Sequence, residues 1–246
     1  MRTFGIIGFP LSHSFSQKYF TQKILDEYIQ DALFVNFPIP AIENLPKLLK
    51  SVSNLRGLAV TIPYKKQVLP YLQDFTNEVK QIGACNCIKV TENKLYGYNT
   101  DVVGFEKSFI THLQPHHTNA LILGSGGAAV AVEFVLNKLG IVYQIVSRTG
   151  TSDGRMRYED LDEEVMKQYN VIINCTPLGT FPKVEEAPPI PYHLLTAKHY
   201  LFDLVYNPPL TKFLSLGNER GAVVKNGYDM LTIQAEENWK IWNENV

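Results

Sequence analysis

A strand, a glycine-rich turn and a helix follow one another in the middle of this chain. The apolar run 120–123 leads into a turn of glycine, serine and alanine, and helix-forming residues continue over 130–139. A second apolar run, 142–146, follows at the spacing of a β-α-β unit. Such a turn lets phosphates approach open N–H groups at the start of the helix. The pattern predicts a dinucleotide site at Gly124, Ser125, Gly126, Gly127 and Ala128.

The residues after the second strand indicate which dinucleotide binds. An NAD site usually has an acidic residue there for the ribose 2′-hydroxyl, whereas this chain has Ser147, Arg148 and Thr149. A guanidinium and two hydroxyls suit a 2′-phosphate, so the sequence favours NADP. NAD stays open as an alternative, because Asp153 follows closely and an arginine at a strand end is common.

Composition excludes several classes of function. Of the 246 residues, 45% are hydrophobic and 19% charged, and the net charge is −1, so neither a nucleic acid nor an anionic membrane is an expected partner. We find no apolar run that could span a bilayer, and residues 2–10 resemble a strand more than a signal peptide. The spacing of Cys85, Cys87 and Cys175 suits neither a metal site nor disulfides. We therefore expect a cytoplasmic protein with reduced thiols and no metal.

The first hundred residues alternate between strands and helices of their own. We expect strands at 4–9, 33–37 and 58–62 and helices at 16–30 and 41–53. Residues 85–90 and 94–98 form a predicted hairpin with Glu92-Asn93 at its turn. A helix over 102–113, which Asp101 could cap, and a polar segment at 114–119 precede the glycine turn. Beyond the β-α-β unit, strands are predicted at 171–174, 200–205 and 222–224, with a last helix at 231–244.

Hydroxyls, amides and charged groups gather where strands of the first part end. They are Ser14 and Ser16 after the first strand, Thr61 and Lys65 after the third, Asn86 at the hairpin, and Asp101 after it. Ligands bind beyond the carboxyl ends of strands in open α/β sheets, so this set suits a small, polyhydroxylated anion. Each residue also has a simpler explanation: a serine or Asp101 as a helix cap, Asn86 in a turn, and Lys65 as a solvated helix lysine.

Nine segments along the chain together resemble the shikimate dehydrogenase family. They are residues 8–16, 60–65, 83–86, 97–101, 124–128, 147–149, 174–179, 203–208 and 226–235, in the family's order. The resemblance implies reversible reduction of 3-dehydroshikimate to shikimate with NADPH, in the biosynthesis of chorismate and the aromatic amino acids. It also implies an α/β fold with a substrate domain, a Rossmann-type domain and an active-site cleft between them.

The resemblance also implies a role for individual residues. Lys65 and Asp101 would be the catalytic pair. The substrate would be bound by Ser14, Ser16, Thr61, Asn86, Tyr206 and Gln234. The cofactor would contact Val205, Gly227 and Met230 in addition to the glycine turn and residues 147–149. Residues 1–101 would form the substrate-binding and catalytic domain and 102–230 the NADP-binding domain, with the helix 231–246 packing back on the first. The protein would be a monomer or homodimer.

The chain departs from the family pattern at four positions. Gln17 and Ala59 replace a proline and an asparagine beside the expected substrate site, and Ser147 and Ser152 replace an asparagine and a basic residue of the cofactor motif. Arg148 is then the main expected contact to a 2′-phosphate, with Arg155 or Arg157 as substitutes for the second. Two alternatives follow: a quinate/shikimate dehydrogenase that accepts NAD, and a catalytically silent sensor of NADP or shikimate.

Overall fold

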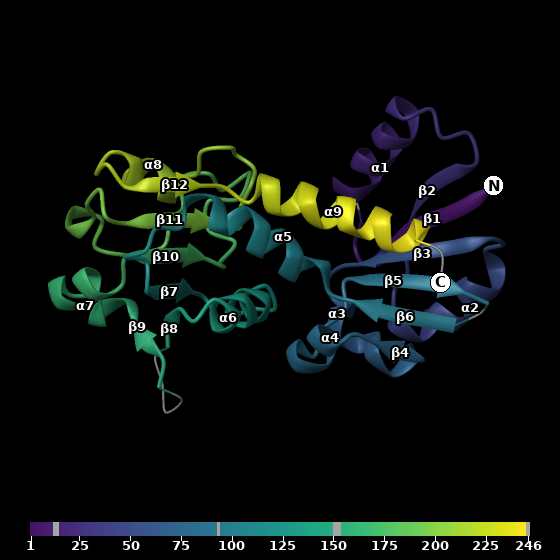
Figure 1. Cartoon of the computed structure of the whole chain (residues 1–246), viewed down its shortest axis with the longest axis horizontal. Coiled ribbons are helices and arrows are strands. Elements are labelled where there is room, and N and C mark those ends of the chain that lie inside the picture. The colour runs from purple at the N-terminus through teal and green to yellow at the C-terminus, as the bar shows by residue number, and fades with distance from the viewer. Residues whose placement is uncertain (12–14, 93, 150–153, 245–246) are drawn as a thin grey trace. The chain divides into compact units, whose positions relative to one another are not determined.

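The computed structural model describes residues 1–11, 15–92, 94–149 and 154–244. The chain divides into two compact units, Met1–Asp101 with Gln234–Val246, and Val102–Ile233. Each unit has a six-stranded sheet with helices beside it (Figure 1). The predicted α/β class is therefore confirmed. No helix in these described ranges is long and apolar enough to cross a membrane.

The sheet of the first unit is mixed, in the order β2-β1-β3-β5-β6-β4. Its strands are β1 (Arg2–Gly8), β2 (Ala32–Pro38), β3 (Leu55–Val60), β4 (Asp74–Phe75), β5 (Cys87–Thr91) and β6 (Lys94–Tyr98). Strands β1, β2 and β3 run parallel, whereas β5 is antiparallel to both β3 and β6. Thr91 pairs with Lys94 across the predicted hairpin, and Glu92 has the positive φ of +45° that a two-residue turn favours. Asn93 lies outside the described residues.

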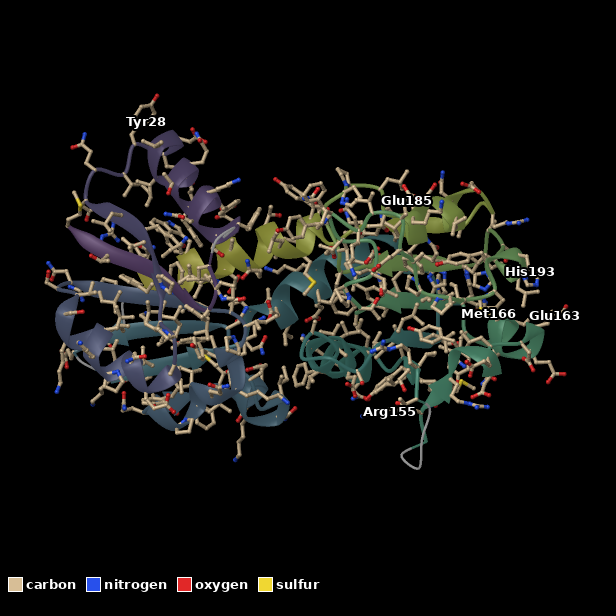
Figure 2. The ribbon with its side chains drawn as sticks, turned by 180° about the vertical axis from the view of Figure 1, so that it is seen from behind. Tyr28, Arg155, Glu163, Met166, Glu185 and His193 are labelled. Atoms are coloured by element: carbon tan, nitrogen blue, oxygen red, sulfur yellow. The ribbon has the colours of Figure 1, made fainter. Side chains whose placement is uncertain are left out.

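Two helices of the first unit are shorter than predicted. The unit contains α1 (Phe15–Asp26), α2 (Leu45–Ser51), α3 (Tyr64–Gln67) and α4 (Asn77–Ile82). Helix α1 ends at Asp26 because Tyr28 takes a left-handed φ of +54°, and Ile29 N–H closes the end on the Ile24 carbonyl. Tyr28 points outward at this end (Figure 2). The helix predicted over 41–53 is split into a 3₁₀ turn, Ile42–Asn44, and α2, which has Pro46 in its first turn.

Aromatic side chains attach the C-terminal part of α9 (Tyr228–Asn243) to the first unit's sheet. The Trp242 ring packs against Phe4 and Phe20, and its Nε1 donates a hydrogen bond to the Ile88 carbonyl at 3.0 Å. Gly57 on β3 gives this ring its place, because a Cβ there would stand 2.3 Å from the Trp242 Cδ1. The absence of a side chain at Gly57 therefore permits close packing of helix on sheet.

The second unit has the parallel sheet that the β-α-β pattern predicts, in the order β12-β11-β10-β7-β8-β9. Its strands are β7 (Asn119–Leu123), β8 (Val142–Ser147), β9 (Met156–Arg157), β10 (Val171–Asn174), β11 (Tyr200–Asp203) and β12 (Val223–Lys225). Its helices are α5 (Thr100–Phe109), which begins at the end of the first unit, α6 (Ala129–Lys138), α7 (Glu163–Gln168) and α8 (Lys212–Asn218). The short strand β9 carries no sequence signal that we recognised.

The strand order of the second unit reverses at β7. Strand β8 lies on one side of β7 and β10 on the other, and the glycine turn follows directly at the carboxyl end of β7. This is the switch point of a doubly wound sheet, where such folds bind their ligands. The registers Leu123↔Asn174 and Asn174↔Asp203 bring the ends of β7, β10 and β11 to the same edge.

Candidate active site

Lys65 and Asp101 form an ion pair at the end of the first unit's sheet. The Lys65 Nζ lies 2.7 Å from the Asp101 Oδ2, and the two side chains are 31% and 19% exposed. Lys65 is on α3, the helix after β3, and its carbonyl accepts a hydrogen bond from the Cys85 N–H at 2.8 Å. Asp101 is not the N-cap of the next helix, because α5 begins one residue earlier, at Thr100. Lys65 is likewise not a simply solvated lysine.

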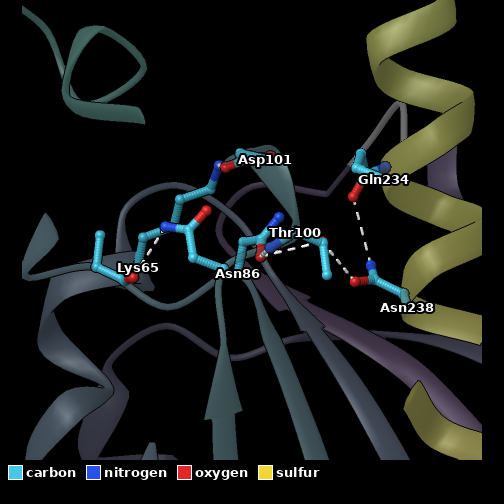
Figure 3. A network of polar contacts seen from close by, with 8 residues as sticks. Lys65, Asn86, Thr100, Asp101, Gln234 and Asn238 are labelled. Atoms are coloured by element: carbon cyan, nitrogen blue, oxygen red, sulfur yellow. Dashed lines mark hydrogen bonds and ion pairs between the residues drawn. The ribbon is translucent and has the colours of Figure 1, made fainter. Parts of the chain in front are cut away.

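A network of polar side chains lies beside this pair (Figure 3). The Asn86 Oδ1 accepts the Thr100 N–H at 2.7 Å, and the Thr100 hydroxyl lies 2.7 Å from the Asn238 Oδ1. The Asn238 Nδ2 lies 3.4 Å from the Gln234 Oε1. Asn86, Thr100, Gln234 and Asn238 are all at least nine-tenths buried. The network thus joins Asn86, the residue before the hairpin strand β5, to helix α9 and fixes the residue before Asp101.

The arrangement presents one positioned proton donor and one amide donor. Within the described residues, the Asn86 Nδ2 has no hydrogen-bond acceptor, so it is available to a ligand oxygen. A lysine ammonium held against a carboxylate can donate a proton to an oxygen that gains negative charge. Burial raises the pKa of the neighbouring Cys85 thiol to about 12, which keeps this thiol neutral and unreactive.

The other predicted substrate residues lie on several elements. Ser14 lies outside the described residues, and Ser16 is in the first turn of α1. Thr61 directly follows β3, and its N–H donates to the Ile7 carbonyl at 3.0 Å. Gln234 is buried on α9 within the network of Figure 3. Tyr206, which is 37% exposed, belongs to the second unit.

The glycine turn of the second unit has the shape of a phosphate-binding cradle. Gly124 requires glycine, because its φ is +95° and a Cβ would stand 2.8 Å from the Thr176 Cγ2. By contrast, a Cβ on Gly126 or Gly127 would meet no described atom within 4 Å, so the turn leaves open space there. Helix α6 starts at Ala129 with no side chain capping its first N–H groups. The Ala129 N–H itself donates to the Gly126 carbonyl at 3.0 Å. Open space and a helix start without a side-chain cap fit a pyrophosphate.

Three polar residues stand at and just beyond the end of β8. Arg148 and Thr149 are exposed, and the structure records no ion pair or hydrogen bond for either among the described residues. Ser147 has a buried hydroxyl that likewise lacks a described partner. Arg157 is already paired with Asp160, with a hydrogen bond of 3.1 Å. The expected substitute for the second basic residue is therefore better supplied by Arg155, just before β9 (Figure 2).

The three remaining predicted cofactor residues follow β11 and β12. Val205 and Gly227 are joined by a hydrogen bond from the Gly227 N–H to the Val205 carbonyl at 3.2 Å. A Cβ on Gly227 would stand 2.2 Å from the Leu204 carbonyl oxygen, so only glycine permits this approach. Met230 lies partly buried in the first turn of α9. Two of the three predicted residues thus contact one another.

The sequence assigned no role to Thr100 and Asn238 of the network of Figure 3, nor to Asn174 and Asp203 of the second unit, where the Asn174 Nδ2 donates a hydrogen bond to the Asp203 Oδ1 at 2.9 Å. Asn238 could have been found, because it follows Gln234 by four positions and so shares its helix face. Asn174 ends the strand predicted over 171–174, which signals a turn as readily as a site. Asp203 falls inside the strand predicted over 200–205, whereas β11 ends at Asp203 itself. Thr100 looked like an ordinary residue before a helix.

Comparison with known proteins shows the family to which the chain belongs. Residues 6–88 match the shikimate dehydrogenase substrate binding domain. A shikimate dehydrogenase (NADP(+)) from Clostridium beijerinckii is 37% identical over 99% of this chain and 93% of its own. The chain belongs to the shikimate dehydrogenase family. Another member, from Methanosphaera stadtmanae, is 32% identical over 97% of this chain and 90% of its own.

Solved structures of the family share the fold. A chorismate mutase/shikimate 5-dehydrogenase fusion protein from Clostridium acetobutylicum is 32% identical, with a TM-score of 0.87 over 99% of this chain and 91% of the other. Shikimate 5-dehydrogenase from Thermus thermophilus, solved with NADP(H) and shikimate, is 29% identical, with a TM-score of 0.85 over 99% of this chain and 94% of the other.

Proposed function

We propose that this protein is an NADP-dependent shikimate dehydrogenase, which reversibly reduces 3-dehydroshikimate to shikimate. The observation that carries the proposal is the Lys65–Asp101 ion pair of 2.7 Å, in a chain 37% identical over almost its whole length to an enzyme of that name. This reaction would place the protein in chorismate and aromatic amino acid biosynthesis. We assign it to the cytoplasm, as a monomer or homodimer.

The first unit would bind the substrate and supply the proton. NADPH, when bound, supplies the hydride that reduces the substrate ketone. As the carbonyl oxygen gains negative charge, the Lys65 ammonium donates a proton to it, and in the reverse direction the lysine takes the proton back. Asp101 holds the ammonium in place and is able to accept a hydrogen bond from a ring hydroxyl. The Asn86 Nδ2 supplies a further donor.

The remaining substrate contacts rest on the resemblance to the family, and the chemistry of the side chains is compatible with them. Ser14 and Ser16 would donate hydrogen bonds to the substrate carboxylate, and Thr61, Gln234 and Tyr206 would bind oxygen atoms of the substrate. These groups are neutral hydrogen-bonding groups. They favour a polyhydroxylated acid, because a more apolar acid would leave some of their hydrogen bonds unmade.

The second unit would hold the dinucleotide. The turn Gly124, Ser125, Gly126, Gly127 and Ala128 would receive the pyrophosphate at the start of α6. Arg148, Thr149 and the Ser147 hydroxyl would bind the 2′-phosphate, and Arg155 would add a second cation. Val205, Gly227 and Met230 would adjoin the nicotinamide. Arg148, which has no ion pair among the described residues, favours NADP, because a guanidinium binds a phosphate more strongly than it binds a bare hydroxyl.

One assay tests the proposal and its rivals. Purified protein is mixed with shikimate and NADP, and NADPH formation is followed by absorbance, with NAD and quinate as parallel substrates. We expect turnover with shikimate and NADP. Comparable rates with NAD or quinate would indicate the dual-specificity enzyme. That alternative stays open because Ser147 replaces the asparagine of the family's cofactor motif. Folded protein that binds NADP and turns over no pair would instead be a sensor.

A further inference from the structure

Asp203 is a fully buried carboxylate at the carboxyl end of β11. Its Oδ1 accepts hydrogen bonds from the Asn174 Nδ2 at 2.9 Å and the Val205 N–H at 3.0 Å. Its Oδ2 accepts one from the Thr211 hydroxyl at 2.6 Å. No cation within the described part of the chain forms an ion pair with it. A buried charge of this kind costs stability unless its hydrogen bonds offset that cost.

Asn174 extends these bonds towards the glycine turn. Its Oδ1 accepts the Thr176 N–H at 3.0 Å and the Thr176 hydroxyl at 2.6 Å. The Thr176 methyl group in turn packs against Gly124, 2.8 Å from the point where a Cβ would stand. The orientation of Asn174, which Asp203 sets, therefore determines where Thr176 lies beneath the proposed pyrophosphate turn.

Val205 extends the network in the other direction. Asp203 binds the Val205 N–H, and the Val205 carbonyl accepts the Gly227 N–H at 3.2 Å. The Gly227 backbone also packs tightly on Leu204. The glycine turn, Val205 and Gly227 are far apart in sequence, yet one chain of hydrogen bonds and contacts through Asp203 joins them.

We propose that Asp203 is a positioning residue for the dinucleotide, holding Val205 directly and the Gly124 turn through Asn174 and Thr176. The inference rests on the proposed function, since it concerns the same cofactor site. Burial raises the pKa of Asp203 to about 6, so the carboxylate is ionised at neutral pH and can accept all three hydrogen bonds. Cys175 and Tyr192, the titratable groups near it, are neutral there, because burial raises the pKa of each.

The test is the affinity of the full-length protein for NADP, measured by titration calorimetry at neutral pH. In Asp203→Asn, an amide NH₂ replaces one acceptor oxygen and faces a donor. We expect the Kd and KM for NADP to rise about tenfold, as when hydrogen bonds behind a binding residue are lost. The KM for shikimate should stay within about twofold. Asp162→Asn is the matched control, because Asp162 caps α7 at the surface and should leave both constants unchanged.

A second pair of variants decides the matter if Asp203→Asn does not fold. Thr176→Val keeps the shape of the side chain and loses its hydroxyl bond to Asn174, whereas Thr176→Ser keeps that bond. We expect the valine variant to bind NADP about fivefold more weakly, which corresponds to about 1 kcal/mol, and the serine variant to bind NADP more tightly than the valine variant does.

Folded Asp203→Asn with a wild-type Kd for NADP would overturn the inference, as would equal binding by the two Thr176 variants. Failure of the proposed function looks different. In that case the wild-type protein itself would not oxidise shikimate, although the effect of Asp203→Asn on NADP binding would persist.

Discussion

The Lys65 ammonium meets the Asp101 carboxylate at 2.7 Å across 36 positions of sequence. The contact exists because α3 follows β3 directly while α5 starts beyond the hairpin strand β6, two strands away in the same sheet. Both side chains keep part of their surface in solvent. Lys65, the candidate proton donor, is therefore held in place by a residue of the same unit and stays accessible to a ligand.

Removing the Lys65 ammonium should lower kcat far more than it raises KM. Lys65→Met keeps most of the length of the side chain and removes the ammonium that donates the proton, so we expect kcat to fall about 10²- to 10⁴-fold, the usual contribution of general acid–base catalysis. Steady-state kinetics with shikimate and NADP measure both constants. Lys66→Met is the control, because Lys66 is exposed on the same helix and should retain full activity. A change in KM alone would make Lys65 a binding residue.

Thr100 should contribute to stability through its buried hydroxyl, which is 1% exposed and lies 2.7 Å from the Asn238 Oδ1. Thr100→Val leaves the amide oxygens of Asn86 and Asn238 short of a donor. We expect a loss of about 1–3 kcal/mol in the free energy of unfolding, measured in urea. The exposed Thr118 provides a comparison, since Thr118→Val should change that free energy by less than about 0.5 kcal/mol. Equal effects at both positions would contradict the role of the network.

Local patterns predicted the sheets better than the polar networks. The β-α-β unit at 120–146 and the hairpin at 85–98 depend on apolar runs and turn residues that are neighbours in sequence, and both are present as expected. Helix α1 ended early because Tyr28 adopts a left-handed conformation, usually taken by glycine. The pattern of residue types does not show that Tyr28 takes this conformation.

Some residues of the candidate sites could likewise be predicted from local motifs, and others could not. Lys65, Asp101 and the glycine turn could be proposed because their motifs carry a chemistry of their own. Asp203 and Asn174 could not, because their importance depends on register: Asn174 pairs with Asp203 across β10 and β11, and only then do their side chains meet. Contacts between strands that are about thirty residues apart are set by the tertiary fold.

Gly57 should tolerate no side chain. A Cβ would stand 2.3 Å from the Trp242 ring, so Gly57→Ala forces β3 and α9 apart. We expect a loss of about 1–3 kcal/mol in stability, with a change in native tryptophan fluorescence. Trp242→Phe relieves the clash but removes the hydrogen bond from the Trp242 Nε1 to the Ile88 carbonyl. The double variant should lose less stability than the sum of the two single losses, because the two side chains no longer clash. A loss equal to that sum would show that Gly57 and Trp242 do not interact.

Gly126 should be needed for the cofactor and not for the fold. No described atom lies within 4 Å of a Cβ on Gly126, so Gly126→Ala should leave the free energy of unfolding unchanged or raise it by up to about 1 kcal/mol. The same methyl group would occupy space that a pyrophosphate needs. The Kd for NADP should rise at least about tenfold, or about 1.4 kcal/mol.

Gly124→Ala supplies the contrast to Gly126→Ala. Its φ of +95° and its contact with Thr176 predict a loss of about 1–3 kcal/mol in stability. Calorimetric binding and urea unfolding of the two variants therefore separate the roles of the two glycines. A destabilised Gly126→Ala with normal NADP affinity would show that this part of the turn is structural only.

The buried His117 should make the second unit less stable in acid. Its Nδ1 accepts the Gln114 N–H at 2.9 Å, so the ring is neutral with its proton on Nε2, facing the Lys198 carbonyl at 3.1 Å. Burial lowers the pKa of His117 below its ordinary 6.5, and the neighbouring His116 and His199 add to this effect. In the unfolded chain the ring takes up a proton as the pH falls through 6.5, whereas the native ring does not.

The free energy of unfolding should therefore be highest above about pH 7 and fall as the pH decreases through 6.5 towards the lower native pKa. His117→Asn keeps an acceptor and a donor and has no titrating group, so its stability should depend less on pH over this interval. Urea unfolding of both proteins at several pH values between about 5 and 8 measures the difference, and the ring signals of His117 in NMR report its pKa directly. Parallel stability curves, or a His117 ring that titrates above 6.5, would show that the native state does not favour the neutral ring.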